Sequence, residues 1–290
     1  MLGIVAPNKD ITAWVEAIHA ADDTIPVSVW PDISPATRLL LCWDPPSGTF
    51  SRLPELQAIC VMGAGTDRLE ADPELPMDIP LLRLKNAQLS RDMFYHVMHC
   101  VESWRLNMPT YSAQQTKKTW LPYPYRNRAT VDVTVLGLGE IGSVVAQQLA
   151  AQGYNVSGWS RTEKSVSGVK CFAGLPNLVA AVTAADVLVC LLPLKADTEG
   201  VITKDLLQSM APESCFINVA RGAHVNEAGL LDSMTSPIKT AFLDVFHEEP
   251  LPEHHPFWQR SDIVITPHVA SLTEPETAIA EVIDYYQRLN

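Results

Sequence analysis

Short apolar runs alternate with amphipathic segments along the first part of the chain. Residues 2–7 (LGIVAP) are typical of a buried strand, whereas residues 11–21 (ITAWVEAIHAA) repeat apolar side chains at helical spacing. Further strands are predicted at 25–30, 37–43, 58–63 and 79–85, with a short helix near 53–57. Strands that alternate with helices predict a parallel sheet covered on both faces.

The same alternation resumes after a long helix, which we predict over residues 90–107 and expect to end before Pro109. The segment 111–130 is polar and aromatic with two prolines, so we expect a connector there. Further strands are predicted within 133–136, 154–159, 185–193, 213–220, 239–246 and 262–268, followed by a helix over 274–290. This second series again predicts a parallel sheet.

A glycine-rich turn joins one of these strands to a helix. Gly137, Gly139 and Gly142 stand between the strand 133–136 and the helical stretch 143–153. In a dinucleotide-binding βαβ unit such glycines allow a tight turn, close approach of the backbone to a pyrophosphate, and close packing of helix on strand. The helix N-terminus adds N–H groups and a positive dipole. We assign the whole turn to a dinucleotide site: Gly137, Leu138, Gly139, Glu140, Ile141 and Gly142.

The residues after the next strand, 154–159, indicate which dinucleotide binds. An acidic residue about 20 positions beyond the turn usually holds the adenosine ribose of NAD. The chain instead carries Ser160 and Arg161 there, with Thr162 and Lys164 close behind. A carboxylate would repel the 2′-phosphate of NADP, whereas an arginine and hydroxyl groups favour it. These four residues therefore predict NADP(H); the alternative is that Arg161 is an ordinary solvated loop charge.

Composition narrows the range of partners. The chain of 290 residues carries a formal net charge of −12, which would repel nucleic acid and anionic membranes. No apolar run reaches the ~18 residues of a membrane span. The six cysteines form no CxxC pair and several lie in apolar runs, so we expect free thiols in a cytoplasmic protein. His254 and His255 lack the spacing of a metal-ligand set, so we predict no metal.

Several phrases in the sequence resemble one known family. FINVARG (216–222), FLDVFHEEPLP (242–252) and ITPHVAS (265–271) are similar to segments of the D-isomer-specific 2-hydroxyacid dehydrogenases. LCWDPP, VMGAGTDRL, GWSRTEKS and VARGAHVNE narrow the resemblance to the NADPH-dependent glyoxylate/hydroxypyruvate reductase A group. The likeness runs over most of the chain and is strongest from Val131 to Ser271.

The resemblance implies a catalytic trio. Its arginine is Arg221 of the ARG phrase, its acid is Glu249 before Pro-Leu-Pro, and its histidine is His268 of the PHVA phrase. These residue types suit reduction of a 2-oxo acid, because a histidine can donate the proton, a carboxylate can fix its tautomer, and an arginine can clamp the substrate carboxylate. Taken alone, each residue has a structural alternative, and choosing Glu249 over the adjacent Glu248 depends on the family phrase.

Other predicted site residues extend this assignment. The turn at Ala64 and Gly65 follows a strand and exposes backbone N–H groups that can bind an anion. The resemblance implies that this turn meets the substrate carboxylate, and Trp43 is predicted to wall the same pocket; an ordinary tight turn and a packed surface tryptophan are the alternatives. To the cofactor site we also assign Leu192, Pro193, Ala220 and Asp244.

Together these features predict an α/β protein with two Rossmann-like domains, each a parallel sheet flanked by helices, and an active site in the cleft between them. Residues 1–90 plus 269–290 form the expected substrate domain, and residues 91–268 the expected dinucleotide-binding domain. The predicted activity is NADPH-dependent reduction of a small 2-oxo acid such as glyoxylate or hydroxypyruvate. A formate- or phosphite-type dehydrogenase and a non-catalytic dinucleotide sensor remain the alternatives.

A homodimer is the predicted assembly. The helix 90–107 and the connector after it are apolar and aromatic enough for a dimer face. The family that the chain resembles usually dimerises.

Overall fold

The computed structural model describes residues 1–84 and 87–289, which form two compact units. Unit 1 comprises Met1–Leu89 and Leu272–Asn290, and unit 2 comprises Ser90–Ser271. Each unit is built on a sheet whose strand pairs are all parallel, so the predicted α/β fold class is confirmed. Within the described ranges, no helix has both the length and the apolar character needed to cross a bilayer.

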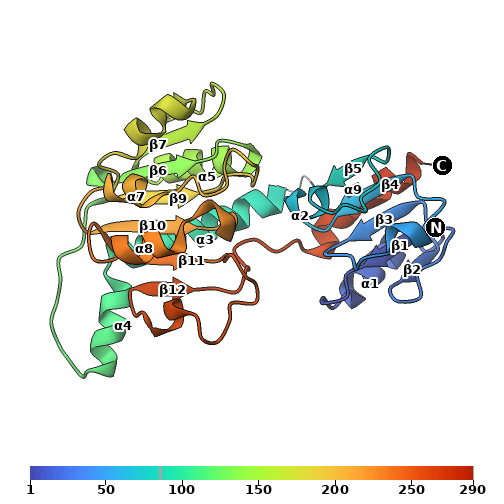
Figure 1. Cartoon of the computed structure of the whole chain (residues 1–290), viewed down its shortest axis with the longest axis horizontal. Coiled ribbons are helices and arrows are strands. Elements are labelled where there is room, and N and C mark those ends of the chain that lie inside the picture. Colours follow the sequence, from blue (N-terminus) through green and yellow to red (C-terminus); the bar gives the residue numbers. More distant parts are fainter. Residues whose placement is uncertain (85–86, 290) are drawn as a thin grey trace. The chain divides into compact units, whose positions relative to one another are not determined.

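Unit 1 holds a five-stranded sheet in the order β2-β1-β3-β4-β5 (Figure 1). Its strands are Leu2–Val5 (β1), Val27–Val29 (β2), Leu39–Cys42 (β3), Ala58–Val61 (β4) and Leu81–Arg83 (β5), and its helices are Thr12–Ala21 (α1), Asp67–Glu70 (α2) and Pro275–Gln287 (α9). On β3, Leu39 and Leu41 pack in one core with α1 and α9, whereas Leu40 and Cys42 pack on the other face with Phe50. Successive side chains of a strand point to opposite faces, so a strand buried on both sides reads as one continuous apolar run.

Unit 2 holds a seven-stranded sheet in the order β12-β11-β10-β9-β6-β7-β8 (Figure 1). Its strands are Asp132–Leu136 (β6), Asn155–Ser160 (β7), Val169–Ala173 (β8), Val187–Cys190 (β9), Ser214–Asn218 (β10), Ile238–Leu243 (β11) and Ile263–Ile265 (β12). Its helices are Ala87–Arg105 (α3), which begins in unit 1, Met108–Thr116 (α4), Glu140–Ala151 (α5), Leu178–Val182 (α6), Lys204–Gln208 (α7) and Glu227–Ser233 (α8). The strand order reverses between β6 and β9, and such switch points are where open α/β sheets bind ligands.

Two cores lie on opposite faces of this sheet. Val187 and Val189 of β9 belong to a buried cluster that includes side chains of α3 and α5. Leu188 and Cys190 of the same strand belong to a second cluster, with α6, α7 and α8. The sheet is therefore covered on both faces, and the carboxyl ends of its strands carry the loops that build the site.

Three elements differ from the sequence prediction. The segment expected to be a connector, residues 111–130, begins inside α4. Pro109 starts this helix rather than preventing it, because a proline in the first helical turn removes an N–H that has no intrahelical partner. Residues 53–57 form turns instead of the predicted helix, after a 3₁₀ turn at Phe50–Arg52. Strand β8 was not predicted, because it lies at the sheet edge and is only partly buried.

Candidate functional site

The three predicted catalytic residues follow three neighbouring strands of unit 2. Arg221 comes after β10, Glu249 after β11 and His268 after β12, and these strands are adjacent in the sheet. Because the strands are parallel, their carboxyl ends meet at one edge, which is the ligand-binding edge of an open α/β sheet. The fold thus gathers at one edge segments that are up to 47 positions apart in sequence (268 − 221).

His268 and Glu249 are joined by a hydrogen bond. The ring Nδ1 of His268 lies 2.9 Å from Oε2 of Glu249, and the other carboxylate oxygen accepts the backbone N–H of Phe246 at 3.0 Å. The two side chains are 30% and 18% exposed, so the pair is partly shielded yet reachable from solvent. A carboxylate fixed at both oxygens sets the ring orientation and leaves Nε2 as the nitrogen that can meet a reacting group.

The backbone around His268 is fixed by Asp244, the first residue after β11. His268 has a φ of 54°, a left-handed conformation that few non-glycine residues adopt. The backbone N–H of His268 donates to the carbonyl of Asp244 at 2.8 Å. The carboxylate of Asp244 is buried and accepts hydrogen bonds from residues on either side of His268. We call Asp244, Glu249 and residues 266–270 the histidine corner.

The Arg221 turn lies against the segment that holds Glu249. A Cβ added to Gly222 would come within 1.9 Å of the backbone carbon of Phe246, so only glycine allows this approach. Phe246 is the residue whose N–H binds Glu249. The Arg221 guanidinium donates to the carbonyl of Ala220 at 2.6 Å. The backbone carbonyl of Arg221 accepts a hydrogen bond from the side-chain amide of Asn218 at 3.0 Å. The packing of Gly222 therefore brings the arginine turn next to the histidine corner.

The glycine-rich turn packs closely against the start of helix α5. Gly137 has a φ of 101°, and a Cβ added to Gly142 would lie 1.8 Å from the Gly137 carbonyl, so turn and helix α5 are in direct contact. Gly139 caps α5 without a side chain, and a Cβ added there would meet nothing within 4 Å. A side chain at the cap position of α5 would therefore point into open space, and glycine leaves this space beside the helix N-terminus unfilled.

The other residues of this turn differ in how far their side chains are exposed to solvent. Leu138 is buried and its side chain packs against Gly158 of β7, whereas Glu140 is exposed and Ile141 is half-buried. Leu138 therefore fixes the turn on the neighbouring strand, and the other two border its open side.

Residues Ser160–Lys164, which we call the arginine loop, are held more loosely. Ser160 is buried and its hydroxyl donates to the carbonyl of Thr162 at 2.7 Å, so this side chain shapes the loop from inside. Arg161, Thr162 and Lys164 are exposed. The Arg161 guanidinium lies 3.1 Å from the carboxylate of Asp197, and the two side chains are 65% and 44% exposed. Sequence reasoning missed this partner because it follows a different strand, β9.

The remaining predicted cofactor residues follow strands β9, β10 and β11. Leu192 is buried and its backbone nitrogen lies against the Gly137 turn, whereas Pro193 is exposed. Ala220 is buried beside Arg221, and Asp244 belongs to the histidine corner. Sequence reasoning also missed Thr198, whose hydroxyl donates to the carbonyl of Pro193 at 2.7 Å and so shapes the loop that carries Asp197.

The predicted substrate residues Trp43, Ala64 and Gly65 lie in unit 1 at the ends of adjacent strands. Trp43 follows β3, and a Cβ added to Gly63 after β4 would meet its ring at 3.0 Å. The ammonium of Lys9 stands 4.3 Å from the centre of the same ring. Desolvation, followed by the nearby charge of Arg68, lowers the pKa of Lys9. Lys9 is a cation at this edge that no sequence motif indicated.

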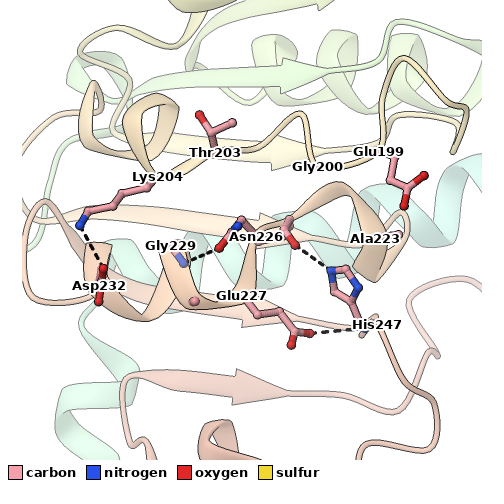
Figure 2. Close-up of a pocket in the computed structure, with 12 residues that line it drawn as sticks. Glu199, Gly200, Thr203, Lys204, Ala223, Asn226, Glu227, Gly229, Asp232 and His247 are labelled. Atoms are coloured by element: carbon pink, nitrogen blue, oxygen red, sulfur yellow. Dashed lines mark hydrogen bonds and ion pairs between the residues drawn. The ribbon is translucent and has the colours of Figure 1, made fainter.

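An open cavity of about 780 Å³ lies elsewhere in unit 2, beside α7 and α8 (Figure 2). Four of its polar side chains have partners within the protein: Lys204 pairs with Asp232 at 3.0 Å, Asn226 caps α8 by accepting the Gly229 N–H, and the His247 ring binds the carbonyl of Val225. None of the predicted site residues lines it. We therefore place the candidate site at the strand ends and not in this cavity.

The structure also describes the surroundings of the cysteines and of the metal-ligating residue types. Burial raises the pKa of the Cys190 thiol to about 12, so this thiol stays protonated and is a poor nucleophile. Among residues 1–84 and 87–289, no three His, Cys, Asp or Glu side chains cluster as metal ligands would.

Comparison with known proteins identifies the family. Residues 97–270 match the model of the D-isomer specific 2-hydroxyacid dehydrogenase, NAD binding domain. The chain is 35% identical to a glyoxylate/hydroxypyruvate reductase A of Yersinia enterocolitica, over 98% of this chain and 93% of that protein. It is 37% identical to the protein of the same name from an Enterobacter species, over 95% of this chain and 90% of that protein.

Solved structures show the same fold. A D-isomer specific 2-hydroxyacid dehydrogenase from Xanthobacter autotrophicus, in complex with NADPH and MES, superimposes with a TM-score of 0.93 at 36% identity, covering 99% of this chain and 93% of that one. An NADPH-dependent glyoxylate/hydroxypyruvate reductase from Sinorhizobium meliloti, in complex with NADP and sulfate, gives a TM-score of 0.91 at 30% identity, covering 100% and 95%.

Proposed function

The chain belongs to the D-isomer specific 2-hydroxyacid dehydrogenase family, and we propose that it uses NADPH to reduce a small 2-oxo acid, such as glyoxylate or hydroxypyruvate. The observation that carries the proposal is the His268–Glu249 hydrogen bond beside the Arg221 turn, at the ligand-binding edge of the sheet. The names of the relatives support the choice of these two acids.

In the proposed mechanism His268 is the proton donor. Its Nδ1 is engaged by Glu249, so Nε2 is the nitrogen that gives a proton to the carbonyl oxygen of the substrate. Glu249 holds the ring in place, and Arg221 binds the substrate carboxylate through its planar fork. When bound, NADPH supplies the hydride for the carbonyl carbon. Hydride and proton together convert the carbonyl group into the hydroxyl group of the 2-hydroxy acid.

The proposed cofactor site runs along the ends of β6, β7 and β9. The open N-terminus of α5 at Gly139 fits a pyrophosphate. In the arginine loop, Arg161 and Lys164 are exposed cations and β7 ends in Ser160 rather than a carboxylate, which favours the 2′-phosphate of NADP(H) over the free ribose hydroxyl of NAD(H).

A steady-state assay tests the activity directly. The purified protein is offered NADPH or NADH with a panel of 2-oxo acids, and the chirality of the product is determined. We expect turnover of glyoxylate and hydroxypyruvate, a preference for NADPH, and D-configured product wherever the product is chiral. Tight NADPH binding without turnover of any 2-oxo acid would favour the sensor alternative, and oxidation of formate or phosphite would favour the second alternative.

The predicted homodimer is also a proposal. It is supported by the segment from α4 to residue 127, which we call the arm. Helix α4 has no buried residue, and it stands clear of the sheet of unit 2 together with the chain that follows it (Figure 1). The large apolar side chains exposed along this arm are Met108, Trp120, Leu121, Tyr123 and Tyr125, and Trp120 is 98% exposed. Exposed apolar groups concentrated in this way mark an association surface. Light scattering should give the mass of a dimer, and Leu121→Asp should give a monomer.

Two expectations remain predictions. Trp43, Ala64 and Gly65 of unit 1 are expected to contact the substrate, so Trp43→Ala should raise the KM for the 2-oxo acid more than that for NADPH. A cytoplasmic location fits the free cysteines, because thiols persist in a reducing compartment. Fractionation of cells that express the protein tests the location.

A further inference from the structure

Lys9 lies at the carboxyl edge of the unit 1 sheet with an aromatic ring beside its ammonium. It follows β1, and its Nζ is 4.3 Å from the centre of the ring of Trp43, which follows the adjacent strand β3. The Trp43 ring packs in turn on Gly63, since a Cβ added to Gly63 would meet the ring at 3.0 Å. An exposed cation gains little from the face of a ring, so this contact leaves the Lys9 charge available to another partner.

The charges near Lys9 leave its ammonium without an anion. Within the described part of the chain, no carboxylate forms an ion pair with it. The adjacent Asp10 carboxylate instead accepts the Thr12 N–H at 2.9 Å, at the start of α1. Partial burial, followed by the like charge of Arg68, lowers the pKa of Lys9. Both effects disfavour the ammonium, and an anion bound beside it would offset both.

This cation is accessible in a protein whose overall charge is negative. The formal net charge of −12 repels anions over most of the surface, so an anionic ligand needs a local excess of positive charge. Lys9 and Arg68 are both exposed and close enough for their charges to interact. They therefore give this edge of unit 1 the positive charge that an anionic group requires.

We propose that Lys9 determines substrate specificity by binding a second anionic group, so that the preferred 2-oxo acids carry a carboxylate or a phosphate in addition to the carboxylate of the 2-oxo acid group. The inference deepens the proposed function and rests on it, because Trp43 beside Lys9 is one of the residues expected to contact the substrate. Arg221 is proposed to bind the carboxylate of the 2-oxo acid group, and Lys9 serves the other charge. A lysine ammonium is a compact point charge, which suits either kind of anion.

Two matched pairs of substrates measure this preference. Oxaloacetate and 2-oxobutyrate have chains of equal length and differ by a carboxylate in place of a methyl group. Phosphohydroxypyruvate and hydroxypyruvate differ by a phosphate in place of a hydroxyl group. We expect kcat/KM with NADPH to be at least about 10-fold higher for the charged member of one pair. The pair that shows this preference identifies the group that Lys9 binds.

The main variant is Lys9→Met, which keeps an unbranched side chain beside Trp43 and removes the charge. We expect kcat/KM for the preferred charged substrate to fall about 10- to 100-fold, chiefly through KM, and kcat/KM for its uncharged counterpart to change less than about 2-fold. Lys9→Arg keeps the charge and should retain most of the preference.

Product binding gives a readout that needs no turnover. D-Malate and phospho-D-glycerate are the products expected from the two charged substrates, and D-2-hydroxybutyrate and D-glycerate are their uncharged counterparts. None of them reacts with the reduced cofactor, so calorimetric titration of the protein with NADPH present measures binding alone. The charged member of the preferred pair should bind at least about 10-fold more tightly than its counterpart in the wild type, and with nearly equal affinity in Lys9→Met.

Arg52→Met is the matched control. Arg52 is another unit 1 cation beside a tryptophan ring, since its guanidinium carbon is 4.9 Å from the centre of the Trp30 ring. Its guanidinium already donates to the carbonyl of Pro31 at 3.0 Å. The variant therefore removes a comparable charge that has a partner within the protein, and it should leave the preference for the charged substrate unchanged.

Each outcome bears on one proposal. Equal kcat/KM within both pairs in the wild type would overturn the inference. An equal fall for charged and uncharged substrates in Lys9→Met would do the same, because Lys9 would then bind a group common to all of them. If Lys9→Met does not fold, Lys9→Gln decides by the same ratios. Lys9-dependent binding of a charged product without turnover of any 2-oxo acid would uphold the inference and refute the proposed function.

Discussion

The histidine corner and the arginine loop both lie at the carboxyl ends of unit 2 strands, yet they are built differently. In the corner, buried Asp244 and half-buried Glu249 each have both carboxylate oxygens engaged by protein donors. In the loop, the exposed guanidinium of Arg161 has one exposed carboxylate, that of Asp197, at 3.1 Å. One region is fixed before any ligand arrives, and the other keeps its charges in solvent.

The difference matches the two tasks that we propose for these regions, proton transfer and phosphate recognition. Proton transfer depends on geometry within a few tenths of an ångström, so the groups that perform it gain from being locked by hydrogen bonds. Recognition of a phosphate depends chiefly on charge, which acts over several ångströms and is screened by salt. Substitutions in the corner should therefore change rates, and substitutions in the loop should change affinity and its salt dependence.

The largest effect is expected at His268, the proposed proton donor. His268→Gln should lower kcat about 100- to 10,000-fold, the usual contribution of a positioned general acid, with little change in the Kd for NADPH. His254→Gln alters an exposed histidine elsewhere in unit 2 and should keep full activity. Steady-state kinetics at saturating substrate gives kcat, and titration with the cofactor gives the Kd. A large loss of NADPH affinity in His268→Gln would break the proposed division between the two regions.

The second test concerns Glu102, a carboxylate outside the candidate site that hydrogen bonds hold in place. Burial opposes ionisation of Glu102, but its hydrogen bonds with Arg105, Tyr154 and Arg128 outweigh burial and lower the pKa of this carboxyl to about 2. Glu102→Gln should therefore reduce the free energy of unfolding by about 2–3 kcal/mol at pH 7 and leave kcat unchanged, since the network touches no site residue.

The pH dependence of this loss follows from the sign of the shift. A carboxyl whose pKa is lowered in the folded state stabilises the fold above its unfolded value of about 4.3, and this stabilisation disappears as the pH falls toward 2. The difference between wild type and Glu102→Gln should thus be full at pH 7 and shrink below pH 4 in urea unfolding curves. A constant difference across this range would contradict the assignment.

The third test concerns the arginine loop. Arg161→Ala should weaken NADPH binding about 10- to 100-fold, because it removes a charge-assisted hydrogen bond to a phosphate. Binding of NADH should change little, and so should kcat at saturating NADPH. Lys204→Ala removes another exposed cation of unit 2 that pairs with a carboxylate, and serves as the control. An unchanged ratio of NADPH to NADH affinity would remove Arg161 from the cofactor site.

The smallest effect is expected at Asp197. This carboxylate competes with a 2′-phosphate for the Arg161 guanidinium, so Asp197→Asn should tighten NADPH binding about 3- to 10-fold at low salt. The gain should fade at high salt and vanish in an Arg161→Ala background. Titrations at two ionic strengths measure it, with Asp232→Asn, the carboxylate that pairs with Lys204, as the control. Weaker NADPH binding in Asp197→Asn would mean that this carboxylate orients Arg161 instead.

Local patterns in the sequence predicted the parts of the molecule that local physics decides. The glycine spacing at 137–142 predicted the turn before α5, and continuous apolar runs predicted the buried strands. The prediction of a connector was wrong where the structure has helix α4. A proline within the first helical turn can start a helix as readily as a proline further along ends one. Strand β8 was missed because an edge strand needs no apolar run.

Contacts between distant residues could not be predicted in the same way. Asp244 and Thr266 are 22 positions apart, and Arg161 and Asp197 are 36 apart. Each pair is brought together by the order of strands in the sheet, which no local pattern records. The proposed catalytic trio rests on phrases that resemble those of a family and stays a prediction, while the loop contacts of Asp244 are visible only in the fold.

The exposure of Trp120 gives the protein an optical probe of its own. Of the seven tryptophans, Trp120 is 98% exposed, whereas Trp104 and Trp159 are 2% and 3% exposed. An indole in water emits at longer wavelengths and is quenched by acrylamide, and one covered by another protein surface is shielded from both effects. If a second copy covers the arm, dilution of the protein should shift its fluorescence to the red and restore quenching, without any added label.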